Sequence, residues 1–266
     1  MTLAILYTSF RQLEELQLYP DMLNRNPHTS EADVIYHNNN PAFTTTQIEE
    51  ALCKVPYKSL KIIHSPQKNA GGYPYGQFEA ILDSWDILIT KGYDWVIHLH
   101  PDIFLIDESK LLAEIDHATS SSADILVTAT FGHTAPAYAT DFFCFRPARV
   151  LKSLFESYLP LLKAPIVVPL EYLFYNEIFR AKLKTHVAVR FLHGHYHRDI
   201  DQLGLWHEHN LLRVRLYMQN PNSRWRTLPA SIAKSPYRAF RIYLKYVRRR
   251  CRRESQDSIG AQLTVL

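Results

Sequence analysis

The sequence predicts an α/β fold in which helices flank a mostly parallel sheet. Short apolar runs of about five residues, rich in Ile, Val, Leu and Tyr, recur between residues 3 and 145. Segments with a helical spacing of apolar residues lie between several of these runs. Strands that alternate with helices are typical of parallel sheets, in which ligands bind at the carboxyl ends of the strands.

The apolar runs are interpreted as strands that are buried on both faces. They are Leu3–Tyr7, Asp33–His37, Leu60–Ile63, Trp95–Leu99, Ile125–Thr128 and Phe142–Phe145. The clearest helix is Gly76–Lys91, which Gly92 follows as a C-terminal stop. Further helices are expected at Glu108–Thr119, Ala148–Leu162 and Leu170–Leu183.

The composition is that of a globular protein. With 266 residues, of which 47% are hydrophobic and 21% charged, the chain is long enough for one full-sized core. Three scattered cysteines, Cys53, Cys144 and Cys251, form no disulfide framework and indicate a reducing cytoplasm. The N-terminus has no basic residue before its short apolar run, and no stretch approaches the roughly 20 apolar residues of a membrane span. We therefore expect neither a signal peptide nor a transmembrane helix.

Basic residues are concentrated near the C-terminus. The net charge is +4, but nine of the 30 Lys and Arg residues lie between Lys234 and Arg253, a segment without acidic residues. The apolar spacing there predicts a basic amphipathic helix over residues 231–253, followed by a polar tail over residues 254–266. Residues 235–253 suit an anionic membrane surface. The alternatives are a helix docked on the core and, least favoured, an RNA-binding arm, so no nucleic acid is expected as a partner.

The stretch WVIHLHPDIFLID, Trp95 to Asp107, is an apolar strand that runs into polar residues and then into a second apolar run. His100 and Asp102 are two positions apart, so in an extended chain their side chains project to the same side and share one cation or one ribose. Imidazole and carboxylate ligands suit a divalent ion such as Mn²⁺, which neutralises charge on a departing diphosphate. The alternative is structural, with His98 and His100 as hydrogen-bonded strand residues and Asp102 as the cap of a turn.

This segment resembles the DxD element of GT-A-type glycosyltransferases, with His100 in place of the first Asp. In that family the pair binds the ribose and the metal-bridged diphosphate of a nucleotide-sugar. The resemblance implies a GT-A-like, Rossmann-like domain over residues 1–230. It also implies a Mn²⁺ or Mg²⁺ cofactor held by Asp102, and a metal or ribose role for His100.

Two segments before the HLHPD stretch follow the order of the same family. The first predicted strand ends in YTSFR, which resembles the family's first nucleotide-contacting loop but also fits an ordinary strand exit. In NAGGYPYGQF, glycines precede a helix so that backbone amides can face a ligand, although the spacing matches neither a dinucleotide fingerprint nor a P-loop. The donor contacts that the resemblance implies are Thr8, Ser9, Arg11, Asn69 and Gly72.

Downstream segments supply the implied catalytic groups. TDFFCFRP resembles the family's segment beside the sugar, so Asp141 is expected to contact the donor sugar or the acceptor. PLEYLFYNEIF places Glu171 in the first turn of a helix, where the helix dipole favours a carboxylate. In inverting members a carboxylate in a comparable place deprotonates the acceptor hydroxyl. A C-terminal histidine commonly completes the metal site, and His193 or His195 would serve. The structural alternatives are a turn residue, a helix-terminal charge and a polar surface loop.

The resulting hypothesis is a cytoplasmic glycosyltransferase, peripheral on the inner membrane face. It moves a sugar from a nucleotide-sugar donor, with uridine as the expected base, to a glycan or lipid-linked acceptor in cell-surface polysaccharide synthesis. One rival is a metal-dependent hydrolase, because GHYH, Gly194 to His197, is similar to the GHxH element of metallophosphoesterases, although their upstream blocks are absent. The other is a sugar-binding module without catalysis, because His100 departs from the usual acid.

Overall fold

The chain forms two compact units, residues 1–209 and 210–266. The computed structural model describes residues 1–9, 18–52, 58–65, 75–100, 102–131, 137–163, 168–192, 200–208, 213–215 and 217. Residues 213–215 and 217 of the second unit are helical. The predicted boundary at residue 230, the basic helix over 231–253 and the tail over 254–266 lie outside the described residues. No helix in the described ranges has both the length and the apolar character that crossing a membrane requires.

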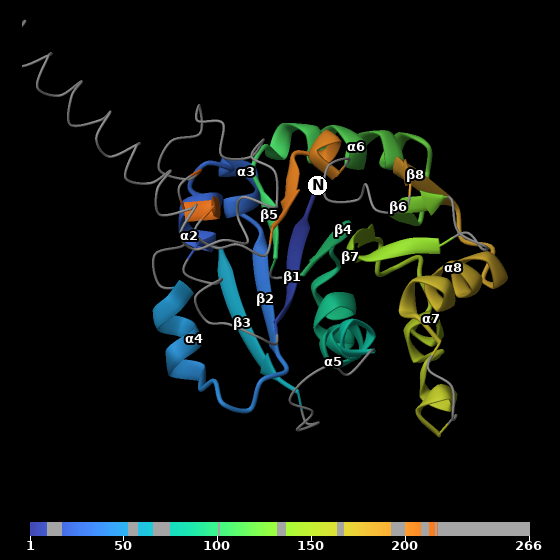
Figure 1. The fold of residues 1–266 in the computed structure, drawn as a ribbon, viewed down its shortest axis with the longest axis horizontal. Helices are drawn as coiled ribbons and strands as arrows, with labels where there is room; N and C mark the ends of the chain where they lie inside the picture. Colours follow the sequence, from blue (N-terminus) through green and yellow to red (C-terminus); the bar gives the residue numbers. More distant parts are fainter. Residues whose placement is uncertain are drawn as a thin grey trace, which may run out of the picture. The chain divides into compact units, whose positions relative to one another are not determined.

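The first unit alternates strands and helices along the chain (Figure 1). Its strands are β1 (Leu3–Ser9), β2 (Asp33–Asn38), β3 (Ser59–His64), β4 (Trp95–Leu99), β5 (Ile103–Leu105), β6 (Ile125–Phe131), β7 (Ala137–Phe145), β8 (Thr185–Leu192) and β9 (Leu205–His207). Its helices are α2 (Tyr19–Leu23), α3 (Pro27–Ser30), α4 (Thr45–Leu52), α5 (Gly76–Lys91), α6 (Glu108–Ser120), α7 (Lys152–Glu156) and α8 (Leu170–Arg180), with 3-10 turns η1 (Leu159–Lys163) and η2 (Ile200–Leu203).

Seven strands form one sheet in the order β3-β2-β1-β4-β7-β6-β8. The pairs β3–β2, β2–β1, β1–β4 and β6–β8 are parallel, whereas β7 runs antiparallel to both of its neighbours. The expected fold class, a mostly parallel α/β sheet flanked by helices, is therefore confirmed. Because β7 is reversed, Phe142 in its middle pairs with Leu99 at the end of β4. The first residues of β7 thus reach the edge where the parallel strands end, which we call the carboxyl edge.

The sequence predicts some elements closely and others poorly. α5 has the expected bounds, and Gly92 ends it with a φ of 65°, a conformation that a residue without Cβ adopts readily. The helix expected at Ala148–Leu162 is instead interrupted after Glu156, because Pro160 has no N–H to donate to the Glu156 carbonyl and its ring clashes with that group. β3 is not buried on both faces as predicted, because it lies at the edge of the sheet and its residues are exposed or partly exposed.

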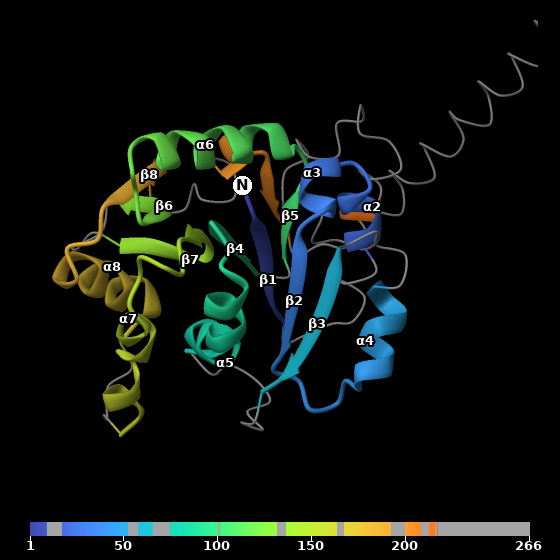
Figure 2. The ribbon, with the colours of Figure 1, turned by 180° about the vertical axis from the view of Figure 1, so that it is seen from behind.

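α5 and α6 cover opposite faces of the sheet (Figures 1 and 2). Val96 on β4 packs in the core cluster that contains Phe78 and Ile81 of α5. Trp95, the preceding residue, points to the other face, where its Nε1–H donates to Oγ1 of Thr119 on α6 at 2.9 Å. Aromatic side chains fill the core on the α5 face, and each of them buries a large apolar area. The fully buried ones there include Phe78, Phe143, Phe145, Phe155 and Phe174.

A hydrogen-bond network ties the strands together at the amino edge, where the parallel strands begin. Oδ1 of buried Asp33 accepts a hydrogen bond from Oγ of Ser59 at 2.6 Å, and Oδ2 accepts one from the Tyr93 hydroxyl at 2.8 Å. Burial by itself raises the pKa of Asp33, but these hydrogen bonds, with Lys58 and Lys91 nearby, outweigh burial and hold the pKa below its ordinary value. The network joins the starts of β2, β3 and β4.

A second, two-stranded antiparallel sheet consists of β5 and β9. Gly204, just before β9, has a φ of 68°, and a Cβ at this position would overlap the carbonyl oxygen of Asp107. The backbone N–H groups of Ile106 and Asp107 donate to the carbonyl of Gly204 at 2.8 and 3.1 Å. This close approach sets the register of the two strands, which brings His207 beside Asp102, the residue directly before β5.

Candidate functional site

Several predicted site residues gather at the carboxyl edge, where β1 and β4 end and β7 begins. His100 follows β4 directly, and its backbone N–H donates to the carbonyl of Asp141 on β7 at 2.9 Å. Thr8, the penultimate residue of β1, is buried, and its Oγ1 forms a hydrogen bond with Nε2 of His98 at 3.1 Å. Three adjacent strands thus bring Thr8, His100 and Asp141 to one region of the sheet.

Asp102 lies between two imidazoles. Its Oδ1 is 3.3 Å from Nδ1 of His100, and its Oδ2 is 3.2 Å from Nε2 of His207. Burial by itself raises the pKa of Asp102, but the hydrogen bonds and charges of His100 and His207 outweigh burial and hold the pKa well below its ordinary value. Asp102 is therefore an anion at neutral pH, and 15% of its side chain is exposed.

Sequence reasoning missed His207 as the partner of Asp102. The N–H of Glu208 donates to the carbonyl of Asp102 at 3.0 Å, so the backbone also holds the two segments together. The His207 side chain is 8% exposed. The sequence does contain one signal for this contact, a histidine at the end of the short apolar run Leu205–His207. If such a run is buried, its histidine needs a polar partner.

A second polar group of the carboxyl edge consists of Gln77, Asp141 and Glu171, from α5, β7 and α8. Oδ1 of Asp141 accepts a long hydrogen bond of 3.5 Å from Nε2 of Gln77. Gln77 is a further residue that the sequence did not single out. Its Oε1 is buried and has no hydrogen-bond partner in the described ranges. Glu171 lies in the first turn of α8, as predicted, and interacts electrostatically with Asp141.

Glu171 has the protonation behaviour of a proton acceptor. Burial raises the pKa of Glu171, a hydrogen bond from its own backbone N–H offsets part of this rise, and the charge of Asp141 adds to it. A carboxylate with a raised pKa binds a proton more readily than an ordinary one. Its position at the carboxyl edge, near a second carboxylate, suits a general base that acts on a hydroxyl group.

His98 is a structural residue in this arrangement. Burial, together with the nearby His100 and His37, lowers the pKa of His98 to about 3, so its imidazole is neutral. Its ring stacks on that of Phe143, with the ring centroids 4.7 Å apart. The side chain therefore packs in the core and binds Thr8, which agrees with the structural alternative for this histidine.

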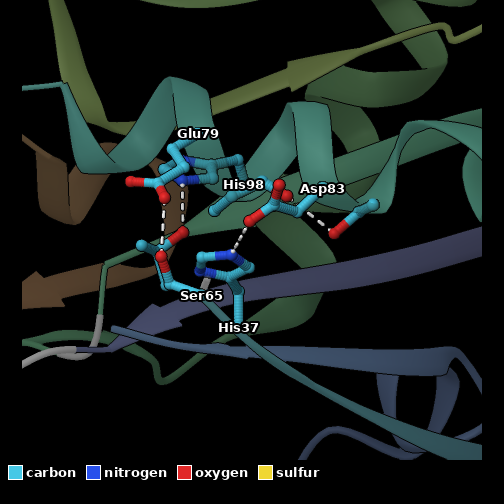
Figure 3. Close-up of polar contacts among 8 residues, drawn as sticks. His37, Ser65, Glu79, Asp83 and His98 are labelled. Carbon is cyan, nitrogen blue, oxygen red and sulfur yellow. Dashed lines mark hydrogen bonds and ion pairs between the residues drawn. The ribbon is translucent and has the colours of Figure 1, made fainter. Parts of the chain in front are cut away.

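Polar side chains, of which Glu79 and His37 are buried, join α5 to β2 and to the residue after β3. Figure 3 shows Glu79 and Asp83, one turn apart on α5, with Ser65 and His37 facing them. Oγ of Ser65 donates to Oε1 of Glu79 at 2.6 Å, and Nε2 of His37 lies 2.7 Å from Oδ2 of Asp83. These contacts fix the first turns of α5 against the sheet, and thereby the position of Gln77.

The other predicted site residues, Arg11, Asn69, Gly72, His193 and His195, lie outside the described residues. Of Ser9, only the backbone at the end of β1 is described. In the described part of the chain, no three His, Cys, Asp or Glu side chains are grouped so as to hold a metal ion. Nδ1 of His100 and Oδ1 of Asp102 are close enough to share one cation, and their chemistry suits Mn²⁺. These two residues therefore fit a divalent cation as two of its ligands.

Comparison with known proteins places the fold. No protein-family model and no curated protein matches the sequence. The chain is similar to a protein from Desulfovibrio desulfuricans G20 assigned as a nucleotide-diphospho-sugar transferase, with a TM-score of 0.52 and 14% identity over 94% of this chain and 98% of that chain.

Two further solved structures match over less of this chain. One is CMP:2-keto-3-deoxy-manno-octonic acid synthetase in complex with CTP, with a TM-score of 0.43 and 10% identity over 72% of this chain and 90% of that chain. The other is a nucleoside-diphosphate-sugar pyrophosphorylase from Vibrio cholerae RC9, with a TM-score of 0.40 and 11% identity over 72% and 93%. The first similarity shows the fold alone: the chain has an α/β, Rossmann-like fold similar to that of the Desulfovibrio protein.

Proposed function

We propose that this chain transfers a sugar from a nucleotide-sugar donor to a hydroxyl group of an acceptor. The observation that carries the proposal is the arrangement of two carboxyl groups at the carboxyl edge: Asp102 lies between His100 and His207, and Glu171 lies in the first turn of α8 near Asp141. The pKa of Asp102 is lowered and the pKa of Glu171 is raised. Such a difference separates a permanent anion from a proton acceptor. The similarity in fold to a protein assigned as a nucleotide-diphospho-sugar transferase supports the same function.

On the donor side, Asp102 and His100 bind the nucleotide part of the donor, for which we propose a uridine diphosphate. The anionic oxygens of Asp102 accept hydrogen bonds from ribose hydroxyls, and His207 holds this carboxylate in place. When a divalent cation is bound by His100 and Asp102, it supplies positive charge beside the departing diphosphate. Thr8, buried at the end of β1, closes the inner side of this region.

On the acceptor side, Glu171 takes the proton of the attacking hydroxyl. The hydroxyl oxygen forms a bond to C1 of the donor sugar, the bond from C1 to the diphosphate breaks, and the nucleoside diphosphate leaves with the bonding electrons. Asp141 accepts hydrogen bonds from sugar hydroxyls, and Gln77 donates to Asp141 and so orients its carboxylate. Attack on the side opposite the leaving group inverts the configuration. The proposed acceptor is a glycan or a lipid-linked saccharide of cell-surface polysaccharide synthesis.

A panel of nucleoside diphosphates and nucleotide-sugars, with and without Mn²⁺, tests this function on the full chain. We expect one nucleotide to raise the Tm of the native protein but not that of Asp102→Asn. Glu171→Gln should show the same rise in Tm but should no longer release the nucleoside diphosphate from the corresponding nucleotide-sugar. The absence of a shift with every nucleotide would refute the proposal, and a shift without turnover would favour the non-catalytic sugar-binding module. A rise in Tm that a nucleotide produces equally without Mn²⁺ would contradict the bound cation but not the proposed sugar transfer.

Residence in the cytoplasm, with residues 235–253 at the inner membrane face, stays a prediction. Sedimentation with anionic and with neutral liposomes tests the membrane part of it. The full chain should sediment with anionic liposomes only, and a chain that ends at Ala233 should stay in the supernatant. If the two chains sediment equally with anionic liposomes, residues 235–253 do not bind the membrane.

A further inference from the structure

One side of α8 carries a row of three residues, Glu171, Tyr175 and Phe179. The proposed chemistry uses only the first of them. Leu170, Phe174 and Ile178 are buried against the sheet. Glu171, Tyr175 and Phe179 follow them by one position and lie on successive turns, about 6 Å apart along the helix axis. Glu171 and Tyr175 are partly buried, whereas Phe179 is 76% exposed. The row thus leads from the candidate base outward to the surface.

A hollow of about 310 Å³ opens beside this row. We call it the aromatic hollow, and its lining residues are Tyr138, Tyr175, Ile178, Phe179, Lys182, Leu183 and Thr185. The ring centroids of Tyr138 and Tyr175 lie 5.0 Å apart, with the ring planes tilted by 55°. Tyr138 belongs to β7, the strand that also carries Asp141. Two elements that line the hollow, β7 and α8, are therefore also the elements that carry Asp141 and Glu171.

Polar groups surround the aromatic rings. The Tyr138 hydroxyl is hydrogen-bonded to the side chain of Thr185, and the charge of Arg190 acts on it. Lys182 is exposed at the mouth of the hollow. The hollow thus combines aromatic faces with hydroxyl groups and a cation, within the usual volume of a small-molecule site.

We propose that the aromatic hollow binds a sugar unit of an oligosaccharide acceptor, beyond the unit that receives the transferred sugar. This inference rests on the proposed function. A pyranose ring matches the hollow because its C–H face packs on an aromatic ring while its hydroxyl groups bond to the polar rim. The path from Glu171 to Phe179 covers about 12 Å of helix axis, the length of a short oligosaccharide.

Other occupants match the hollow less well. An acyl chain would gain nothing from the hydroxyl groups of Tyr138 and Thr185 or from the charge of Lys182, which line the hollow. A second copy of the chain would need an interface of about 800 Å² on each partner, far more than the hollow alone supplies. Both are outcomes that the experiment below separates from a bound saccharide.

Two surface substitutions in the full chain test the inference. Phe179→Ser removes the rim of the hollow, and Leu151→Ser, at a residue that is 67% exposed before α7, is the matched control. Titration calorimetry with neutral and uronate-containing tri- to hexasaccharides measures binding. We expect the native chain and Leu151→Ser to bind one saccharide series equally, and Phe179→Ser to bind it at least ten times more weakly. Tyr175→Leu, which keeps an apolar side chain without the ring, should show the same loss.

The inference is overturned if the native chain binds no saccharide, or if Leu151→Ser weakens binding as much as Phe179→Ser does. It is also overturned if Phe179→Ser changes only the sedimentation mass, which would indicate a second copy, or only the binding to neutral liposomes, which would indicate an acyl chain. The nucleotide shift is measured on the same variants. If a nucleotide raises the Tm of the native chain but no saccharide binds, the saccharide site is refuted and the proposed function is not. Saccharide binding that depends on Phe179, without any nucleotide shift, refutes the proposed transfer and keeps the sugar site.

Discussion

Nε2 of His207 lies 3.2 Å from Oδ2 of Asp102, although 105 residues separate the two in the chain. The contact exists because β9 pairs with β5 and places His207 at the residue before β5. A carboxylate that is largely buried needs such a partner, since an unpaired buried charge is costly. The environment of Asp102 therefore depends on a strand from the far end of the first unit.

The first prediction concerns this contact. His207→Leu removes one partner of a largely buried carboxylate, so we expect a loss of about 1–3 kcal/mol in the free energy of unfolding and weaker nucleotide binding. His207→Gln keeps an N–H donor near Asp102 and should lose less of both. Denaturant titration and the nucleotide thermal shift measure the two effects. Equal values for His207→Leu and the native chain would show that Asp102 does not depend on His207.

Gly204→Ala should disturb the same region through the backbone. The position has a φ of 68°, and a Cβ there would overlap the carbonyl oxygen of Asp107, so β9 has to shift away from β5. We expect a loss of at least about 1 kcal/mol in the free energy of unfolding, with weaker nucleotide binding. Gly92→Ala is the matched control, because it has a similar φ of 65° but open space around its Cβ. It should lose stability without affecting nucleotide binding.

The pH dependence of turnover tests the pairing of Glu171 with Asp141. The base has to be deprotonated, so turnover falls as the pH drops through the pKa of Glu171. Asp141→Asn removes a negative charge that raises this pKa, so the acid limb of the profile should move to lower pH. Hydrolysis of the nucleotide-sugar, with water in place of the acceptor, measures the profile. Glu49→Gln, an exposed position on α4, should leave the limb where it is, and an unmoved limb in Asp141→Asn would argue against Glu171 as the base.

Asp33 should make the fold sensitive to acid independently of any ligand. Its pKa is lower in the folded chain than in the unfolded one, so its stabilising effect is present above the unfolded pKa of about 3.9 and is lost as the pH falls through the folded pKa. Asp33→Asn should be less stable at neutral pH by about 1 kcal/mol and should lose less stability between about pH 5 and about pH 3. Urea titrations at several pH values measure this. Parallel curves for the two proteins would contradict the role assigned to Asp33.

The central part of the fold is predictable from the sequence because its signals are local. Strands β1, β2 and β4 are mostly apolar runs, and α5 has a helical period with a glycine stop at Gly92. The second sheet is not predictable in this way, because β5 and β9 have only three residues each and exist through their pairing. β8 lies at the edge of the large sheet, so its sequence lacks the continuous apolar pattern of a central strand.

The proximity of the candidate site residues was predictable where one segment carries them and less so where several segments meet. His100 and Asp102 are neighbours in sequence, so their proximity follows from the chain itself. Asp141 and Glu171 were inferred from the resemblance to a family, and the structure places their charges within reach of each other. Gln77 and His207 were missed because each acquires its partner only through tertiary packing, and a single sequence contains no record of that contact.

The separation of the two edges of the sheet has a consequence for evolution and for engineering. The network of Asp33, Ser59 and Tyr93 ties the strands at the amino edge, while the described candidate functional groups lie at the carboxyl edge. Residues of one edge can therefore be exchanged without loosening the other. A lineage can change the residues of the carboxyl edge while it inherits the same scaffold, which is consistent with a shared fold at 14% identity. A library randomised only at Gln77, Asp141 and Tyr175 should accordingly contain mostly folded members, from which new donor or acceptor preferences can be selected.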